Sequence, residues 1–242
     1  MQKLRGIVLH SLKYGESSLI VRLYTDVYGR QTYMLRGVRK TTAQHKAACV
    51  QPLFLLALET YPARKAGGMG IIKEMKTLVP LPNMTSDVRK TAMALFISEV
   101  LHRFVKEEEP NPALYDFLQQ HIIALEQIEQ EMANFHLFFL AQLAQHLGFL
   151  PGNTYDARLR CFFDIQAGQF VGTTPLHTQY FSPQNAALLW QLLQSQISDL
   201  QYIKLHHQQR QTLLNGLLDY YSFHLGMQNP IRSLAVLHEV FQ

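Results

Sequence analysis

The chain has 242 residues, of which 48% are hydrophobic and 17% charged, and its formal net charge is +4. This composition is typical of a globular protein with a buried core, and it excludes the low-complexity, fibrous and disulfide-rich classes. No run of 18 or more apolar residues offers a membrane span, and no signal peptide is recognisable. With only Cys49 and Cys161 as cysteines, we expect a protein of the reducing cytoplasm, and without a membrane span we expect no membrane binding.

The charge is divided unevenly along the chain. Residues 1–80 carry a net charge of +9, whereas residues 81–242 carry a net charge of −5. A basic region attracts phosphate, although a basic surface can also serve solubility alone. We therefore expect two domains with different roles, one at 1–80 and one at 81–242.

The N-terminal region predicts a small β-barrel. Apolar and polar residues alternate over 18–25 and 31–38, and the intervening Tyr28-Gly29-Arg30 suits a short loop between two strands. The apolar runs 49–59 and 71–79 add further strands. The glycine-rich stretch RKAGGMG at 64–70 lacks the lysine of a phosphate-binding loop and predicts a hairpin turn. About five short strands within one such region match an antiparallel barrel of the OB-fold type.

Basic residues of this region form a candidate DNA-binding surface. Proteins bind single-stranded DNA with cations that follow the phosphates and with aromatic rings on which bases stack. Tyr24 lies on the same predicted strand face as Arg22 and is the stacking candidate, whereas Tyr33 shares a face with Leu35 and is either a stacking residue or part of the core. The predicted DNA-binding residues are Lys13, Arg22, Tyr24, Arg30, Arg36, Arg39, Lys40 and Lys46.

Beyond residues 80–83, PLPN, the hydrophobic period changes from about 2 to about 3.6, which marks a domain boundary and the start of helices. Helices are predicted after 85–87, from 111–112, over 131–147, after 182–183, over 206–225 and over 233–241. Residues 151–181 contain a small hairpin insertion that turns at 166–168. The predicted fold class is α+β, with an N-terminal barrel and an all-α C-terminal domain that carries this hairpin.

No catalytic or metal-binding pattern is recognisable. His136 and His146 lie nearly three turns apart on one predicted helix, too far to share an ion, and His206 and His207 point to different sides. The motifs HExxH, GxSxG and CxxC are absent. The sequence gives no positive indication of an enzyme.

Two segments near the chain ends resemble the RecO family of bacterial recombination mediators. They are YGESSLIVRLYTDVYGR followed by LRGVRK, and HLGMQNPIRSLAVLHEVF; the middle segments KEEEPNPALYDFL and NFHLFFLAQLAQHLGFLP are similar to RecO proteins of the Bacteroidetes type. The resemblance implies an OB-fold, a helical C-terminal domain, and binding to single- and double-stranded DNA. It also implies annealing of strands coated with single-strand-binding protein (SSB), and loading of RecA together with RecR. RecF is a further candidate partner, and the location would be the cytoplasm, in association with the nucleoid.

The chain departs from the family pattern in its cysteines. Many RecO proteins carry paired CxxC units in the insertion, whereas Cys161 and the nearby His177 cannot form a tetrahedral zinc site alone. We therefore expect no zinc and no other cofactor, with apolar packing of Phe162, Phe163, Ile165, Phe170 and Val171 holding the hairpin.

The resemblance further implies a pocket for the acidic, phenylalanine-ended tail of SSB, which requires an apolar groove rimmed by cations. The candidate residues are Arg89, Lys90, Arg103, Arg158, Arg160, Lys204, Arg210 and Arg232. Arg232 has the best motif match, although a helix cap formed with Ser233 is at least as suitable a role.

Two alternative functions remain open from the sequence. One is an adaptor that does not bind DNA and whose helical domain bridges partner proteins, and the other is a hydrolase of the helical domain with a barrel appendage. Binding to naked single-stranded DNA separates the mediator from the adaptor, and the missing catalytic pattern argues against the hydrolase.

Overall fold

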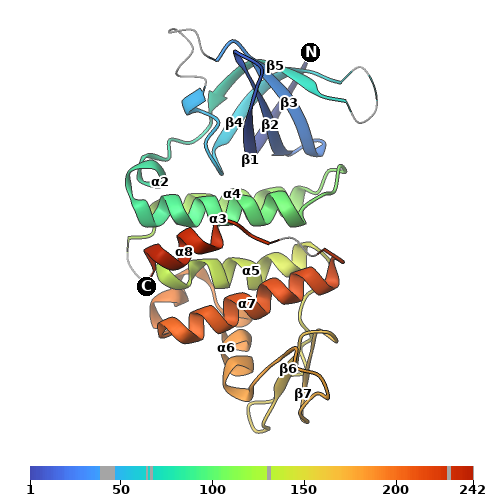
Figure 1. The fold of residues 1–242 in the computed structure, drawn as a ribbon, viewed down its shortest axis with the longest axis vertical. Coiled ribbons are helices and arrows are strands. Elements are labelled where there is room, and N and C mark those ends of the chain that lie inside the picture. Colours follow the sequence, from blue (N-terminus) through green and yellow to red (C-terminus); the bar gives the residue numbers. More distant parts are fainter. Residues whose placement is uncertain (39–46, 64, 66–67, 130–131, 228–229, 242) are drawn as a thin grey trace. The chain divides into compact units, whose positions relative to one another are not determined.

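The structure is a computed structural model that describes residues 1–38, 47–63, 65, 68–129, 132–227 and 230–241. The chain divides into two compact units (Figure 1). The first unit comprises Met1–Gln127 with Ile231–Val240, and the second comprises Ile128–Pro230 with Phe241–Gln242. The compact unit that contains the barrel therefore extends past the predicted boundary at 80/81 and takes in several of the predicted helices.

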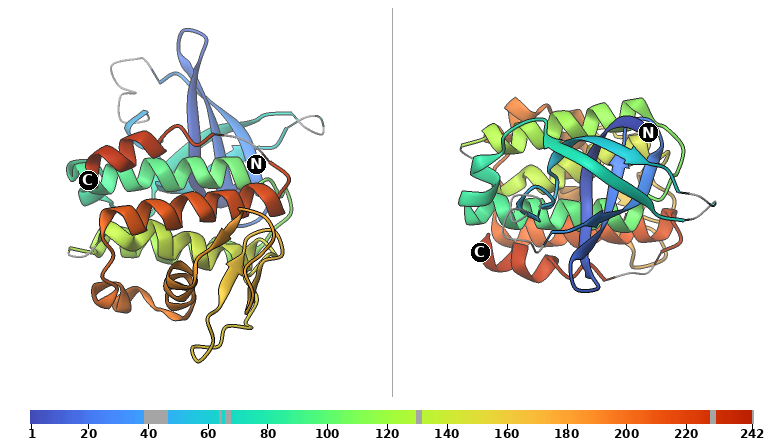
Figure 2. Two further views of the ribbon diagram at one scale, coloured as in Figure 1. Left: turned by 60° about the horizontal axis from the view of Figure 1, so that its bottom comes forward. Right: turned by 90° about the horizontal axis from the view of Figure 1, so that it is seen from above.

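The first unit contains the predicted barrel. Its strands are β1 (Gln2–Tyr14), β2 (Ser18–Thr25), β3 (Gly29–Arg36), β4 (Leu55–Tyr61) and β5 (Gly70–Thr77). They close in the order β1-β2-β3-β5-β4, with β3 and β5 parallel and the other neighbours antiparallel. This is the strand order of an OB-fold, so the predicted fold class is confirmed. The far end of the β1–β2 hairpin projects beyond the rest of the barrel (Figure 2).

Alternation along β2 and β3 sets the barrel core. Val21 and Leu23 of β2 point inward with Tyr33 and Leu35 of β3, and all four are buried. The strand predicted at 49–59 begins only at β4, because the preceding residues turn the chain through Leu53, which has a positive φ of 64°. Hydrophobic burial of these rows supplies the main stabilisation of the barrel.

The helices of the first unit follow the barrel in sequence. They are α2 (Pro82–Ser86), α3 (Val88–Phe104), α4 (Pro112–Gln127) and α8 (Leu234–Val240). The predicted cap of α3 is confirmed, since the Asp87 carboxylate accepts a hydrogen bond from the Arg89 amide. Helix α3 packs on β1, where the Ser98 hydroxyl donates to the Leu9 carbonyl over 2.5 Å. Helix α8 packs on α3.

The second unit combines helices with a small sheet. Its helical elements are η2 (Met132–Asn134), α5 (Phe135–His146), α6 (Pro183–Gln194), η3 (Ile197–Tyr202) and α7 (His207–His224). Its strands are β6 (Phe162–Asp164), β7 (Gln169–Val171) and β8 (Tyr180–Phe181), in the order β7-β6-β8. The predicted hairpin is therefore present, and β8 is a third strand that the sequence did not indicate.

Aromatic packing holds the small sheet. Phe163, Ile165 and Phe170 are buried, as predicted, whereas Phe162 and Val171 are only partly buried. The sheet also rests on α7, because Gly216 has no side chain and the Phe181 ring occupies the space that a Cβ would need. Cys161 is buried and its thiol lies 3.5 Å from the carbonyl oxygen of Asp156.

Helices of the described part of the chain all lack the combination of length and apolar character that crossing a bilayer requires.

Candidate nucleic-acid interface

The outward face of β1, β2 and β3 carries the candidate interface. Strand register places three rows of residues side by side on this face, since directly opposed residues of neighbouring strands share a face. We call these rows the outer strip, which consists of Tyr14, Ser18 and Arg36, then Leu12, Ile20 and Met34, then His10, Arg22 and Thr32.

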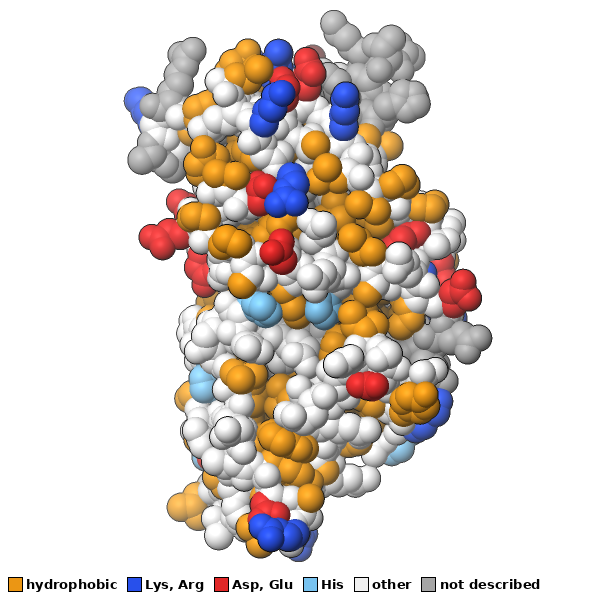
Figure 3. Space-filling view, turned by 180° about the vertical axis from the view of Figure 1, so that it is seen from behind, with side chains coloured by type: hydrophobic (Ala, Val, Ile, Leu, Met, Phe, Trp, Pro, Cys, Tyr) orange, Lys and Arg blue, Asp and Glu red, His pale blue; other side chains and the backbone are white. Residues whose placement is uncertain are grey.

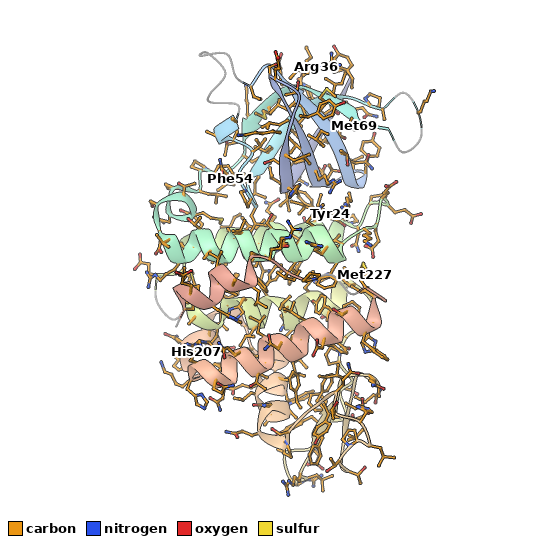
Figure 4. The ribbon with its side chains drawn as sticks, viewed as in Figure 1. Tyr24, Arg36, Phe54, Met69, His207 and Met227 are labelled. Atoms are coloured by element: carbon orange, nitrogen blue, oxygen red, sulfur yellow. The ribbon has the colours of Figure 1, made fainter. Side chains whose placement is uncertain are left out.

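The first row of the outer strip is open to solvent. The Tyr14 side chain is 50% exposed, and Arg36, in the same row, is also exposed. Arg36 lies at the end of the barrel opposite the helices of this unit, and its Nε lies 3.4 Å from the Met34 sulfur (Figure 4). Lys13 is also exposed at this end, but it points to the opposite face of β1, in register with Leu19. A predicted cation, Arg36, and an exposed ring, Tyr14, therefore share one row at this end.

The sequence predicted that Arg22 and Arg30 are available to bind DNA. In the structure neither points freely into solvent, and both reach toward α3. Arg22 Nη1 lies 2.9 Å from His102 Nε2, and Arg30 Nη2 lies 3.3 Å from His102 Nδ1. Arg30 also donates to the Val105 carbonyl over 2.9 Å. Burial, followed by the charge of Arg22, lowers the pKa of Arg30. Neither arginine forms an ion pair with a carboxylate of the described residues.

Burial and the surrounding cations keep His102 neutral. Desolvation and then the charges of Arg30, His10 and Arg22 lower its pKa to about 3. The His10 ring stacks on His102 with ring centroids 4.7 Å apart and an interplanar angle of 10°. Desolvation and the charge of Arg22 also lower the pKa of His10. The inner end of the outer strip is thus a cation-rich cluster with two stacked imidazoles.

Tyr24 is not a stacking residue in this structure, which corrects the prediction. Its side chain is fully buried, and burial raises the pKa of its hydroxyl to about 12. Tyr24 lies at the end of the barrel next to the helices (Figure 4), where neighbouring Arg30 donates its amide to the Glu107 carbonyl. The segment after α3 therefore covers this row. Tyr33 belongs to the barrel core, which resolves the alternative left open by the sequence.

Arg39, Lys40 and Lys46, the remaining predicted DNA-binding residues, lie outside the described residues.

Elsewhere on the barrel three cations are paired with carboxylates. Lys3 and Lys73 both approach Glu59, at 3.6 and 3.9 Å, and Arg5 pairs with Asp26 at 2.9 Å. Figure 3 shows basic and acidic side chains interspersed over the barrel on that face rather than one basic patch. On that face the positive charge is therefore interrupted by carboxylates.

Several predicted tail-binding cations already have structural partners. Lys90 is buried and its ammonium donates to the Glu126 carbonyl, so it cannot meet a peptide, which corrects that prediction. Arg89 and Arg158 pair with nearby aspartates. Arg160 is exposed, with its guanidinium 5.9 Å from the Phe162 ring centroid.

The other four candidates line two cavities, one in each unit. Arg103 and Arg232 line a cavity of about 670 Å³ in the first unit, and Lys204 and Arg210 line one of about 400 Å³ in the second. The Arg210 guanidinium also donates to the carbonyls of Leu205 and Phe241.

Glu99 connects α3 to the start of α8. Its carboxylate accepts hydrogen bonds from the amides of Arg232 and Ser233 and from the Ser233 hydroxyl, and it pairs with Arg103 at 3.1 Å. Desolvation opposes ionisation, but the hydrogen bonds from Ser233, Arg232 and Arg103 outweigh it and lower the pKa of Glu99. The motif at 232–233 therefore ties the start of α8 to α3 through Glu99.

Tyr14 and His10 are not among the residues predicted from the sequence. Both lie on β1, whose long bulged strand was not traced from the sequence; the shift in register between Val8 and His10 places His10 opposite Arg22. Pairing β1 with β2 across the turn at Gly15 could have identified Tyr14, because Tyr14 then lies opposite Ser18 on the outward face. Within the described residues, no group of three or more His, Cys, Asp or Glu side chains could hold a metal ion.

Comparison with known proteins covers the whole chain. Residues 1–80 match the family model described as Recombination protein O N terminal, and residues 85–235 match the one described as Recombination protein O C terminal. The chain is 35% identical to the DNA repair protein RecO of Bacteroides fragilis, with 100% of this chain and 99% of that protein covered. It is 36% identical to the DNA repair protein RecO of Flavobacterium johnsoniae, with coverage of 99% and 98%. A barrel of the OB type, a helical region and relatives that match over their full length lead to one conclusion: the chain belongs to the RecO family of DNA repair proteins.

Proposed function

We propose that this protein is a non-catalytic recombination mediator that binds single- and double-stranded DNA. In this role it anneals strands coated with SSB and, together with RecR, loads RecA onto SSB-coated single strands. RecF is a further partner, and the protein acts in the cytoplasm in association with the nucleoid. Family membership supports each part of this proposal.

The observation that carries the DNA-binding part is the outer strip. Strands 2 and 3 of an OB-fold form the face on which oligonucleotides lie in other proteins of this architecture. Here that face presents the exposed Tyr14 and Arg36, the half-buried apolar side chains of Ile20 and Met34, and then Arg22. Cations flank an apolar row, and the exposed Tyr14 ring can stack on a base, which suits backbone tracking with little sequence preference.

Fluorescence anisotropy with a labelled oligo-dT tests this assignment. Replacing Arg36 by Glu is expected to weaken binding, because it exchanges a phosphate contact for a repulsive charge. Lys76→Glu is the matched control, since Lys76 is an exposed cation of β5 outside the outer strip. Four or five phosphate contacts predict a slope near −3 for the logarithm of affinity against the logarithm of salt, at about 0.7 per contact.

The outcomes separate the mediator from the adaptor. If the parent protein does not bind single-stranded DNA in 50 mM salt, the adaptor function is favoured. If Arg36→Glu and Lys76→Glu weaken binding equally, the DNA contact is not specific to the outer strip.

For the SSB tail we propose the cavity of the second unit. Ile203 and Leu205 supply apolar lining for a terminal phenylalanine, and Lys204 and Arg210 supply cations for acidic residues. Arg210 is held in place by its bonds to backbone carbonyls, and Lys204 is exposed.

An acidic peptide that ends in phenylalanine tests this site. Lys204→Glu is expected to lower the peptide affinity severalfold, and Arg158→Glu, which changes an exposed arginine outside the cavity, is expected to leave it unchanged. Equal affinity of the parent protein and Lys204→Glu would remove the tail from this cavity.

A further inference from the structure

The outer strip leads at its inner end into a cavity of the first unit. The cavity has a volume of about 670 Å³ and lies between β1, α3 and α8. His10, the last β1 member of the outer strip, lines it, and Leu95 and Val236 provide apolar surface. A surface that follows phosphates and a cavity that can hold a ring therefore meet at His10.

The charges around this cavity favour an anion. Arg103 and Arg232 line it directly, and Arg22 and Arg30 lie just behind His102. Glu99 is a lining carboxylate whose charge is offset by Arg103 at 3.1 Å, and its two oxygens accept four hydrogen bonds from Arg103, Arg232 and Ser233, so the positive charges of Arg232, Arg22 and Arg30 are left in excess. The Arg232 side chain is exposed and free to reach a ligand, because it is the backbone amide of that residue that holds Glu99.

The contacts of His102 also leave one arginine N–H without an acceptor. A neutral imidazole has one N–H and one acceptor nitrogen. Guanidinium groups of Arg22 and Arg30 lie at both nitrogens, so only one of them finds an acceptor. The other guanidinium directs its N–H groups at a ring N–H, an arrangement that a nearby negative charge would stabilise.

The ring stack supplies a platform for a base. One face of His10 is covered by His102, and His10 as a whole is exposed. Histidine rings serve as stacking surfaces for unpaired bases. The ring stands beside the cavity and next to Arg22 on the neighbouring strand. This is the arrangement that the sequence had assigned to Tyr24, which is buried.

We propose that this cavity takes one nucleotide of a bound single strand, with the base stacked on His10 and the phosphate held by Arg103 and Arg232. The inference rests on the proposed DNA-binding function. It identifies the cavity as the place where the bound DNA passes from the barrel surface to α3. The strand would run from Tyr14 and Arg36 along the outer strip into the cavity.

Oligo-dT that contains a single 2-aminopurine tests the proposal with the full chain. With the parent protein, stacking is expected to quench the probe at one position of the strand. His10→Ala is expected to abolish that quenching and to weaken binding about tenfold, in the range of one lost base–aromatic stack. His10→Phe keeps an aromatic platform and is expected to retain both. Tyr61→Ala removes an exposed ring of β4 outside the outer strip and is expected to change neither.

The phosphate contact has its own variant. Arg232→Gln keeps the backbone amide that bonds Glu99 and is expected to reduce the salt slope by about 0.7, the contribution of one contact on a single strand. Circular dichroism melting of each variant shows whether the fold is retained.

Three outcomes would overturn the inference. Parent-like affinity and quenching in a folded His10→Ala would leave the proposed function intact but remove the base from this cavity. Equal perturbation of the His10 imidazole NMR signals by inorganic phosphate and by oligo-dT would show an oxyanion site without base stacking. An acidic, phenylalanine-ended peptide can also be added to the complex. If it relieves the quenching of 2-aminopurine while the oligonucleotide stays bound, the cavity is a peptide site. A parent protein that does not bind the strand at all would instead refute the proposed function.

Discussion

Replacing Glu99 by Gln tests whether the C-terminal segment depends on one carboxylate. Gln keeps the shape of the side chain but removes its charge, and its amide group then faces one of the N–H donors of Arg232, Ser233 or Arg103. The Glu99 side chain is only 16% exposed. Hydrogen bonds to a charged group contribute about 1.5–3 kcal/mol each, but they do not add, and the adjoining cavity lets water reach the released amides. We expect the free energy of unfolding of the first unit to fall by about 2 kcal/mol, and its Tm by about 4–8 °C.

The pH dependence of this effect has a definite sign. Because the pKa of Glu99 is lower in the folded protein than its usual value of 4.5, the carboxylate stabilises the folded state above pH 4.5. This stabilisation is lost as the pH falls through the folded pKa. The difference in stability between parent and Glu99→Gln is therefore expected to be full at pH 7 and to vanish in strong acid. Differential scanning calorimetry from pH 7 to pH 3 measures the difference.

Glu239→Gln is the control, since Glu239 is an exposed carboxylate of α8 itself. We expect it to change the Tm by less than Glu99→Gln at every pH. Hydrogen exchange gives a second readout, in which the amides of α8 lose protection in Glu99→Gln alone. Unchanged Tm and unchanged α8 protection at pH 7 would refute the argument that Glu99 holds this helix.

Three further changes test other parts of the structure. Gly216→Ala is expected to destabilise the second unit by about 1–3 kcal/mol despite a better helix propensity, because the new Cβ overlaps the Phe181 ring. Asn215→Ala, at an exposed position of the same helix, is the control. Adding Phe181→Leu to Gly216→Ala should restore part of the Tm. Acidification from pH 7 to 5 is expected to lower the stability of the first unit, because the pKa of His102 is about 3 when folded and 6.5 when unfolded, and urea titrations of His102→Gln should show a smaller decrease. Exhaustive dialysis against a chelator is expected to leave the Tm unchanged, and stoichiometric bound zinc with melting on chelation would contradict this.

The barrel could be predicted from the sequence because strand period and turn residues are local signals. Alternation in 18–25 matches the bounds of β2, and Gly29 has a positive φ of 58° at the turn into β3. Helices α3 and α7 follow from their 3.6-residue period and from capping residues such as Asp87. The closure of five strands in the order of an OB-fold is not local, and the prediction of it rested on strand number and on the family resemblance.

The division of the helices between the two units could not be predicted in the same way. Helix α8 lies far from α3 in sequence, and Ser233 meets Glu99 only in the folded chain. A helix cap by a side chain more than a hundred residues away has no signature in either segment alone. For the same reason, the burial of Lys90 could not be predicted, because its partner is a backbone carbonyl at the end of α4.

The candidate site shows how alternation alone misplaces function. Period 2 assigned Arg22 and Tyr24 correctly to the outward face of the barrel, but an outward face is exposed only where nothing covers it. Residues 105–109 lie against the row of Tyr24 and Arg30, whereas the row of Tyr14 and Arg36 has no such cover among the described residues. Exposure therefore increases along one strand face from the helices to the free end of the barrel. Exposed rings lie at Tyr14 on the open row and at His10 beside the cavity, so the cover on the barrel, rather than the alternation itself, determines which outward rings are accessible.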